Sequence, residues 1–208
     1  ELKELREELK DANAVSMQNY QMDKRIRTLA EKNRLHDVLH RQTAKQIDLL
    51  NGWLHQLSEA RDENSKKELL RRIVVVGAYL KRRNNLILVS EQGGMIKVEE
   101  LRLSIQEMMK NLQIAGISCA ASVQFEQDIP SNVVMELVDF YEHVVESAFD
   151  GLSSLLARFF CREGCFYCCV DAMCGFDLRK LASDKVIVNQ SSDGYYTLSF
   201  KAEGGVCK

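Results

Sequence analysis

The stretch Gln92-Gly93-Gly94 divides this 208-residue sequence into two parts of different character. Before it, residues 1–90 contain only two glycines and no proline, so little in this part interrupts a helix. After it, short apolar runs of strand length alternate with longer runs of helical spacing. We therefore predict two domains, residues 1–92 and residues 93–208.

The first part has the pattern of a long helical hairpin. Apolar residues recur at alternating steps of three and four, as in a coiled coil, at Leu2, Leu5, Leu9 and Ala12. The pattern predicts one helix to about residue 60, a turn in the polar segment 59–67, and a second helix from Leu69. Because a hairpin cannot bury a continuous apolar stripe by itself, we expect a homodimer in which two hairpins form a four-helix bundle.

The second part has the element order of a two-layer α/β sandwich. We predict helices over residues 98–114 and 131–156, the second with Ser131 as its N-cap, and a strand within residues 116–127 between them. Two strand hairpins follow, with turns at residues 162–164 and 191–194. The predicted fold class is α+β, a long antiparallel helical hairpin followed by a two-layer α/β sandwich.

Composition excludes several classes of protein. The net charge of −2 gives no basic excess for binding nucleic acid. No apolar run approaches the roughly 18 residues that a membrane span needs, and no signal peptide is present at the start. The chain begins with Glu1 instead of Met, so we interpret it as part of a longer protein with a membrane or sensor segment upstream. Seven cysteines, an odd number, favour a reducing cytoplasm over a disulfide framework.

One cysteine cluster suggests a different class of protein. Cys161, Cys165 and Cys168 have the spacing of the iron–sulfur signature of radical S-adenosylmethionine enzymes, so an iron–sulfur protein is an alternative interpretation. A strand hairpin at this position would direct Cys165 and Cys168 to opposite faces of the sheet. We therefore predict that these cysteines pack as small apolar residues and that the chain holds no metal here.

The segment Glu31-Lys-Asn-Arg34-Leu-His36-Asp37-Val-Leu39-His40 resembles the phosphoacceptor helix of bacterial sensor histidine kinases. The later segments 116–120, 128–130 and 140–148 resemble the opening of the ATP-binding domain of that family. The resemblance covers nearly the whole chain and implies a sandwich of the histidine-kinase ATPase type.

This resemblance implies that a histidine attacks the γ-phosphoryl group of ATP. Two residues are candidates. His40 has Glu31 and Arg34 upstream at the spacing of the family, whereas His36 is followed by Asp37, the acid expected beside the phosphoacceptor. The choice between His36 and His40 is left open.

The resemblance also implies a site for ATP and Mg²⁺, although the motifs depart from the family pattern. Glu146 occupies the position of an asparagine that helps to hold Mg²⁺. Asp171 and Gly175 match two positions of the Asp-x-Gly-x-Gly turn that contacts adenine, and Met173 replaces its first glycine. The residues after Gly175 are too few for a phosphate-covering lid.

Two functions follow from this resemblance. The first is the cytoplasmic transmitter of a sensor kinase, with impaired ATP binding, which passes a signal to a response regulator. The second is a dimeric scaffold, derived from a kinase, that binds a partner without catalysis.

Overall fold

The structure, a computed structural model, describes the backbone of residues 2–202 and the side chains of residues 13, 15–91 and 94–202. The chain forms two compact units, Glu1–Ala44 and Lys45–Lys208. Helix α1 (Leu2–Glu59) contributes to both units, and the second unit contains all the other elements. The domain boundary predicted at residues 92–93 lies at the end of a helix and stays a prediction.

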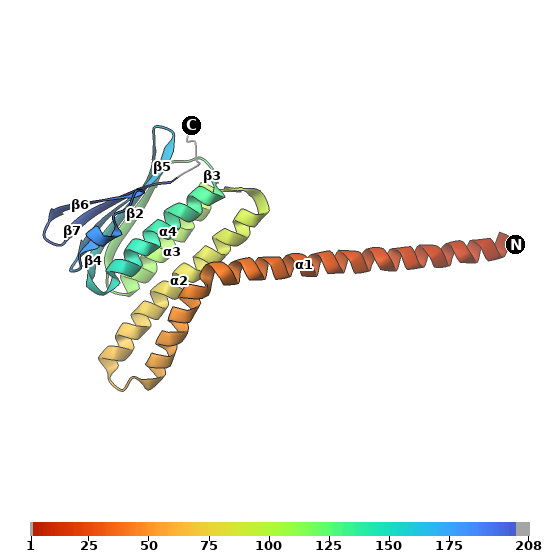
Figure 1. The fold of residues 1–208 in the computed structure, drawn as a ribbon, viewed down its shortest axis with the longest axis horizontal. Coiled ribbons are helices and arrows are strands. Elements are labelled where there is room, and N and C mark those ends of the chain that lie inside the picture. Colours follow the sequence, from red (N-terminus) through yellow and green to blue (C-terminus); the bar gives the residue numbers. More distant parts are fainter. Residues whose placement is uncertain (1, 203–208) are drawn as a thin grey trace. The chain divides into compact units, whose positions relative to one another are not determined.

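The predicted helical hairpin consists of α1 and α2 (Glu63–Gly93), labelled in Figure 1. Its turn is shorter than the predicted segment 59–67, because α2 begins at Glu63. Asp62 caps α2, since its carboxylate accepts a hydrogen bond from the backbone N–H of Ser65 at 2.8 Å. Gly94, with φ of 65°, ends the helix in the left-handed conformation that glycine adopts readily.

The rest of the second unit is an α/β sandwich. Helices α3 (Val98–Ile114) and α4 (Ser131–Ala148) cover one face of a five-stranded sheet with the order β2-β4-β5-β7-β6 (Figure 1). The strands are β2 (Ser118–Gln124), β4 (Leu152–Arg162), β5 (Cys165–Cys174), β6 (Val186–Ser192) and β7 (Tyr195–Lys201). Only the β2–β4 pair is parallel among these described strands.

Two 3₁₀ turns and a small two-stranded ribbon complete the described fold. The strands β1 (Met95–Ile96) and β3 (Ile129–Pro130) pair antiparallel beside the helices. The 3₁₀ turns η1 (Phe149–Gly151) and η2 (Leu178–Leu181) follow α4 and β5. Of these elements, η1 joins α4 to the strand β4.

The predicted helix over residues 131–156 is wrong beyond Ala148. Residues 152–162 form the strand β4, which pairs with both β2 and β5. The apolar run in this segment is compatible with either structure, and the pairing of neighbouring strands decides it. The predicted N-cap is also wrong, because Pro130 occupies the cap position and no side chain caps the helix.

Both strand hairpins are confirmed, with turns of two residues. In the first, Glu163 and Gly164 have φ of 52° and 75°, the left-handed values of a type I′ turn. In the second, Asp193 and Gly194 separate β6 from β7, and Gly194 has φ of 74°. These two turns fix the pairing register of the strands that they join, so that alternate residues of each strand face the helices.

The core lies between the inner face of the sheet and the helices α3 and α4, and α2 adds to it from the other side of these helices. Tyr79 and Leu86 of α2 are buried in this core. The basic cluster 81–83 lies in the middle of α2. Lys81 and Arg82 form ion pairs with Glu107 of α3, and Arg83 forms one with Asp139 of α4 at 2.9 Å.

Candidate functional site

The two candidate phosphoacceptors lie four residues apart on α1, within the first unit. His36 and His40 are both exposed, and their ring centroids are 6.2 Å apart. His36 Nδ1 is 4.0 Å from a carboxylate oxygen of Asp37. An exposed imidazole beside an acid is accessible to another molecule, as phosphotransfer requires. The choice between the two histidines remains a prediction.

Upstream of these histidines, Glu31 and Arg34 interact with each other. The guanidinium of Arg34 donates hydrogen bonds to the carboxylate of Glu31, with the shortest at 2.8 Å. Both side chains are about half exposed, so this pair contributes little to stability. The residues that carry the resemblance therefore form a solvated surface of α1.

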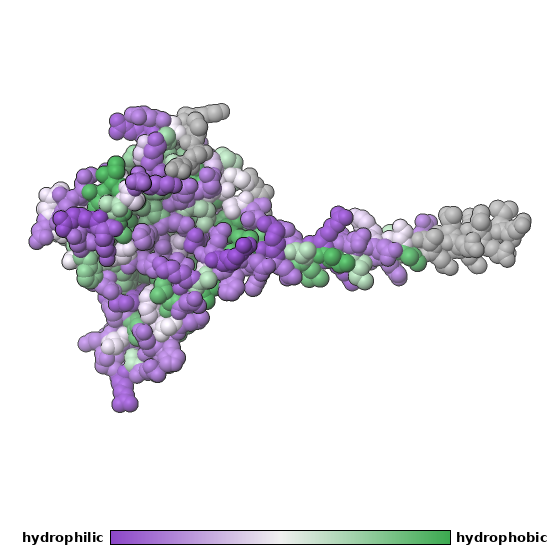
Figure 2. Space-filling view, in the orientation of Figure 1, coloured by the Kyte–Doolittle hydropathy of each residue, from purple (hydrophilic) through white to green (hydrophobic). Residues whose placement is uncertain are grey.

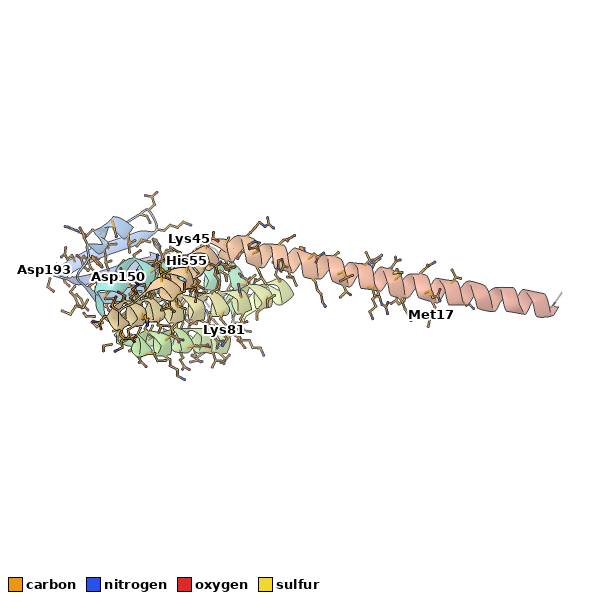
Figure 3. All side chains as sticks on the ribbon, turned by 90° about the horizontal axis from the view of Figure 1, so that it is seen from below. Met17, Lys45, His55, Lys81, Asp150 and Asp193 are labelled. Carbon is orange, nitrogen blue, oxygen red and sulfur yellow. The ribbon has the colours of Figure 1, made fainter. Side chains whose placement is uncertain are left out.

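Glu146, aligned with the Mg²⁺-binding position, lies on the side of α4 that faces the hairpin. Its carboxylate is 3.6 Å from the ammonium of Lys45 on α1, which is labelled in Figure 3. Glu146 also lines a cavity with residues of α1, α2 and α3.

Asp171, aligned with the adenine-contacting position, lies inside β5 and not in a turn. Its carboxylate accepts hydrogen bonds from Arg158 of β4 and Thr197 of β7, both at 2.7 Å. Only 11% of this side chain is exposed. Because the residues of β5 on either side of it, Val170 and Ala172, face the helices, Asp171 faces away from them.

The structure therefore does not bring the three aligned ATP-site residues together. Glu146 lies on the hairpin side of α4, Asp171 lies on the open face of the sheet, and Gly175 follows β5. The N–H of Gly175 donates a hydrogen bond to the carbonyl oxygen of Gly151 at 3.0 Å. The turn predicted over residues 171–175 is wrong, because residues up to Cys174 continue the strand.

The cysteine cluster is divided as the hairpin pattern predicts. Cys168 is fully buried in the core, where burial raises the pKa of its thiol well above the usual value, whereas Cys165 is partly exposed. Cys161 is disulfide-bonded, contrary to the expectation of free thiols, and is not available as a thiolate ligand. Within the described part of the chain, no group of three or more His, Cys, Asp or Glu side chains is placed to hold a metal ion.

Sequence reasoning missed a cavity of about 120 Å³ within the second unit. Its walls come from α1, α2, α3, α4 and η1, and most of the lining side chains are apolar or aromatic. Representative residues are Trp53, Tyr79, Met108, Tyr141 and Phe149. Trp53 of α1 lines this cavity and is partly exposed.

Glu142 is the unusual polar residue of this cavity. It is 9% exposed and forms no hydrogen bond or ion pair with another described residue, although the charges of Arg83 and Lys45 favour its ionised form. Burial raises the pKa of its carboxyl group to about 8, with smaller contributions from the neighbouring carboxylates of Glu146 and Asp139. The sequence does not single out Glu142, because residues 133–148 contain four acids, Glu136, Asp139, Glu142 and Glu146.

The fold and these groups define an α+β protein with exposed histidines on a long helix and a sandwich packed against a hairpin. No protein-family model and no curated protein matches the chain. Within residues 2–202, no helix has a stretch long and apolar enough to cross a membrane.

Solved structures similar to this chain include a bacterial phosphotransferase, with 12% identity over 77% of this chain and 90% of that chain and a TM-score of 0.42. The histidine kinase AdeS of Acinetobacter baumannii is 10% identical over 81% of this chain and 98% of that chain, with a TM-score of 0.40. The kinase domain of the blue-light activated histidine kinase of Erythrobacter litoralis EL346 is 11% identical over 76% and 94%, with a TM-score of 0.43. Likeness at these values does not establish a shared family or function.

Proposed function

We propose that this chain is the transmitter region of a two-component sensor histidine kinase, working as a homodimer and holding ATP poorly. The proposal rests on α1, which is one uninterrupted helix from Leu2 to Glu59. It carries exposed His36 and His40 and then enters the hairpin that shares a core with the sandwich. A displacement at the start of this helix would therefore reach the sandwich through continuous backbone.

Phosphotransfer in this proposal uses the exposed face of α1. The neutral imidazole nitrogen of His40, or of His36, attacks the γ-phosphorus, the bond from that phosphorus to the bridging oxygen breaks, and ADP leaves. The phosphoryl group then passes to a response regulator. A sensor segment upstream of this chain supplies the signal.

Impaired ATP binding is supported by the arrangement of the aligned residues. Asp171 is already bonded to Arg158 and Thr197, so an adenine amino group would have to replace these partners. Glu146 forms an ion pair with Lys45 in the helical layer, away from Asp171 in the sheet. An ATP molecule contacting both residues would have to span the helical layer and the sheet.

The same arrangement supports a second candidate function, a kinase-derived dimeric scaffold that binds a partner without hydrolysing ATP. In that case Asp171 keeps its hydrogen bonds to Arg158 and Thr197, and the exposed histidines take part in no reaction.

Titration calorimetry of the full chain with ATP and Mg²⁺ tests the impaired site, and labelling with γ-labelled ATP separates the two functions. We expect weak ATP binding, with a dissociation constant above about 1 mM, and slow incorporation of label from γ-labelled ATP. Label lost in the His40→Ala or His36→Ala variant identifies the phosphoacceptor. Tight, saturable ATP binding would contradict the impaired site, and absence of any labelled protein would favour the scaffold.

A further inference from the structure

The cavity between the hairpin helices and the helices of the sandwich has the size and lining of a binding site for a small organic molecule. Its volume of about 120 Å³ is close to that of an engineered cavity of about 150 Å³ that binds benzene. The aromatic side chains of Trp53, Tyr79 and Tyr141 contribute to its walls, together with the apolar chains of Met108 and Leu112. A compact apolar group of about six atoms matches this space.

The charges around the cavity favour a cation. Three carboxyl groups and one guanidinium line it. Two of the three acids already have cationic partners, since Asp150 is 2.7 Å from Arg72 and Glu146 is 3.6 Å from Lys45. Lys45 and Asp150 are labelled in Figure 3. The remaining acid, Glu142, has no hydrogen-bonding partner among the described residues and is more than nine-tenths buried.

We propose that this cavity binds a small primary amine with a compact apolar body, whose ammonium group pairs with the carboxylate of Glu142. An ammonium donates up to three hydrogen bonds and supplies the charge that a buried carboxylate lacks. The aromatic rings receive the apolar body and add a cation–π attraction. Ionised Glu142 would repel an anionic ligand, and a neutral ligand would form no ion pair with it; Arg83 and Lys45 act on this carboxyl group without forming an ion pair with it.

The ionisation of Glu142 is coupled to this binding. Its pKa of about 8 in the empty cavity means that the carboxyl group is mostly protonated at pH 7. Ammonium binding favours the carboxylate and releases this proton, so affinity rises as the pH approaches 8. The charged and titratable groups around Glu142 are Glu146, Asp139, Asp150, Arg72, Arg83, Lys45 and Tyr79.

A bound amine would contact helices from both parts of the second unit. Trp53 and Tyr79 belong to the hairpin, and Tyr141 and Glu142 belong to the sandwich. Ligand binding would therefore stabilise the packing of the hairpin on α3 and α4. This site goes beyond the proposed phosphotransfer and does not depend on it.

The test uses isopentylamine with two matched probes, the neutral 3-methylbutanol and the anionic 3-methylbutanoate. Trp53 is the sole tryptophan of the chain, so its fluorescence reports binding in the full-length protein without a label. We expect saturable binding of the amine at least about tenfold tighter than that of the alcohol, and no binding of the acid. Equal affinity for amine and alcohol would overturn the proposal.

Two further measurements locate the site. In Glu142→Gln, amine affinity should fall about tenfold or more and alcohol affinity should change less than about twofold. Glu99→Gln makes the same chemical change on an exposed part of α3 outside the cavity and should leave both unchanged. In the unaltered protein, amine affinity should rise about tenfold or more from pH 6 to pH 8. A flat pH profile, or an unchanged affinity in Glu142→Gln, would refute the role of this residue.

Discussion

Residues 13–44 of α1 and the helix α4 are both regular helices, yet their apolar side chains have opposite environments. In the α1 segment, Val15, Met22, Ile26 and Leu29 are each more than half exposed, and apolar patches are visible along this helix in Figure 2. In α4, ten residues are buried. The two segments share backbone hydrogen bonding, so the difference shows that helical structure alone does not determine burial.

The exposed residues of α1 are not scattered. Val15, Met22, Ile26 and Leu29 are separated by seven, four and three residues, which is the spacing of a coiled-coil seam. Helix α4 is stabilised by the core of its own chain, whereas this seam is suited to a second helix. The proposed homodimer would supply it.

The largest loss of stability is expected from a substitution in the core between α4 and the sheet. Phe159 is fully buried, with its ring 6.3 Å from that of Tyr141, so Phe159→Ala should lower the free energy of unfolding by about 3–5 kcal/mol. Its neighbour Phe160 lies on the open face, stacked on Tyr167, and Phe160→Ala should cost only about 1 kcal/mol. Urea denaturation followed by circular dichroism measures both. Equal losses would mean that the assigned faces of β4 are wrong.

A second change tests the seam of α1. Replacing Ile26 and Leu29 together by lysine should weaken the proposed homodimer about 100-fold or more, because charges would enter an apolar interface. Sedimentation equilibrium measures the association. The matched control replaces Arg27 and Thr28, which lie outside the seam spacing, by lysine. A dimer that tolerates the seam change would show that another surface holds the two copies.

The packing of α2 on α4 is expected to depend on Asp139. Its carboxylate accepts hydrogen bonds from the hydroxyl of Tyr79 and the guanidinium of Arg83, both at 2.9 Å. Asp139→Asn should cost about 1–3 kcal/mol, because the ion pair between Asp139 and Arg83 is lost where the Arg83 side chain is largely buried. Thermal unfolding measures this loss. Glu31→Gln, which breaks an exposed pair on α1, should cost less than about 0.5 kcal/mol.

The last prediction concerns the dependence of stability on pH. Burial raises the pKa of Glu142 from 4.5 to about 8, so between these values the unfolded chain releases a proton that the folded chain retains. Stability should therefore fall by about 1–3 kcal/mol from pH 5 to pH 8 through this group. Glu142→Gln should remove that fall and be the more stable protein at pH 8. Parallel pH profiles of the two proteins, measured by denaturation, would contradict this.

Several elements could be predicted from the sequence because their signals are local. The helical part before residue 92 follows from its scarcity of glycine and proline. The helix over residues 98–114 and both hairpin turns also depend on neighbouring residues alone. The opposite faces of Cys165 and Cys168 follow from the two-residue period of a strand.

The rest required tertiary structure. An apolar run such as residues 152–162 has no periodicity that excludes a helix, and its pairing with β2 and β5 decides the matter. Asp171 matched a turn motif, yet Arg158 and Thr197 hold it inside the sheet from distant parts of the sequence.

The sequence by itself determined the helical hairpin, the change of character at Gln92-Gly93-Gly94 and the presence of a sandwich, because periodicity and turn residues act over a few positions. Only the tertiary structure decided that α2 packs on α3 and α4, and that Glu142 is enclosed with Trp53 beside an open space. Burial, and with it the raised pKa of this acid, depends on which elements meet in space, and no local pattern specifies that.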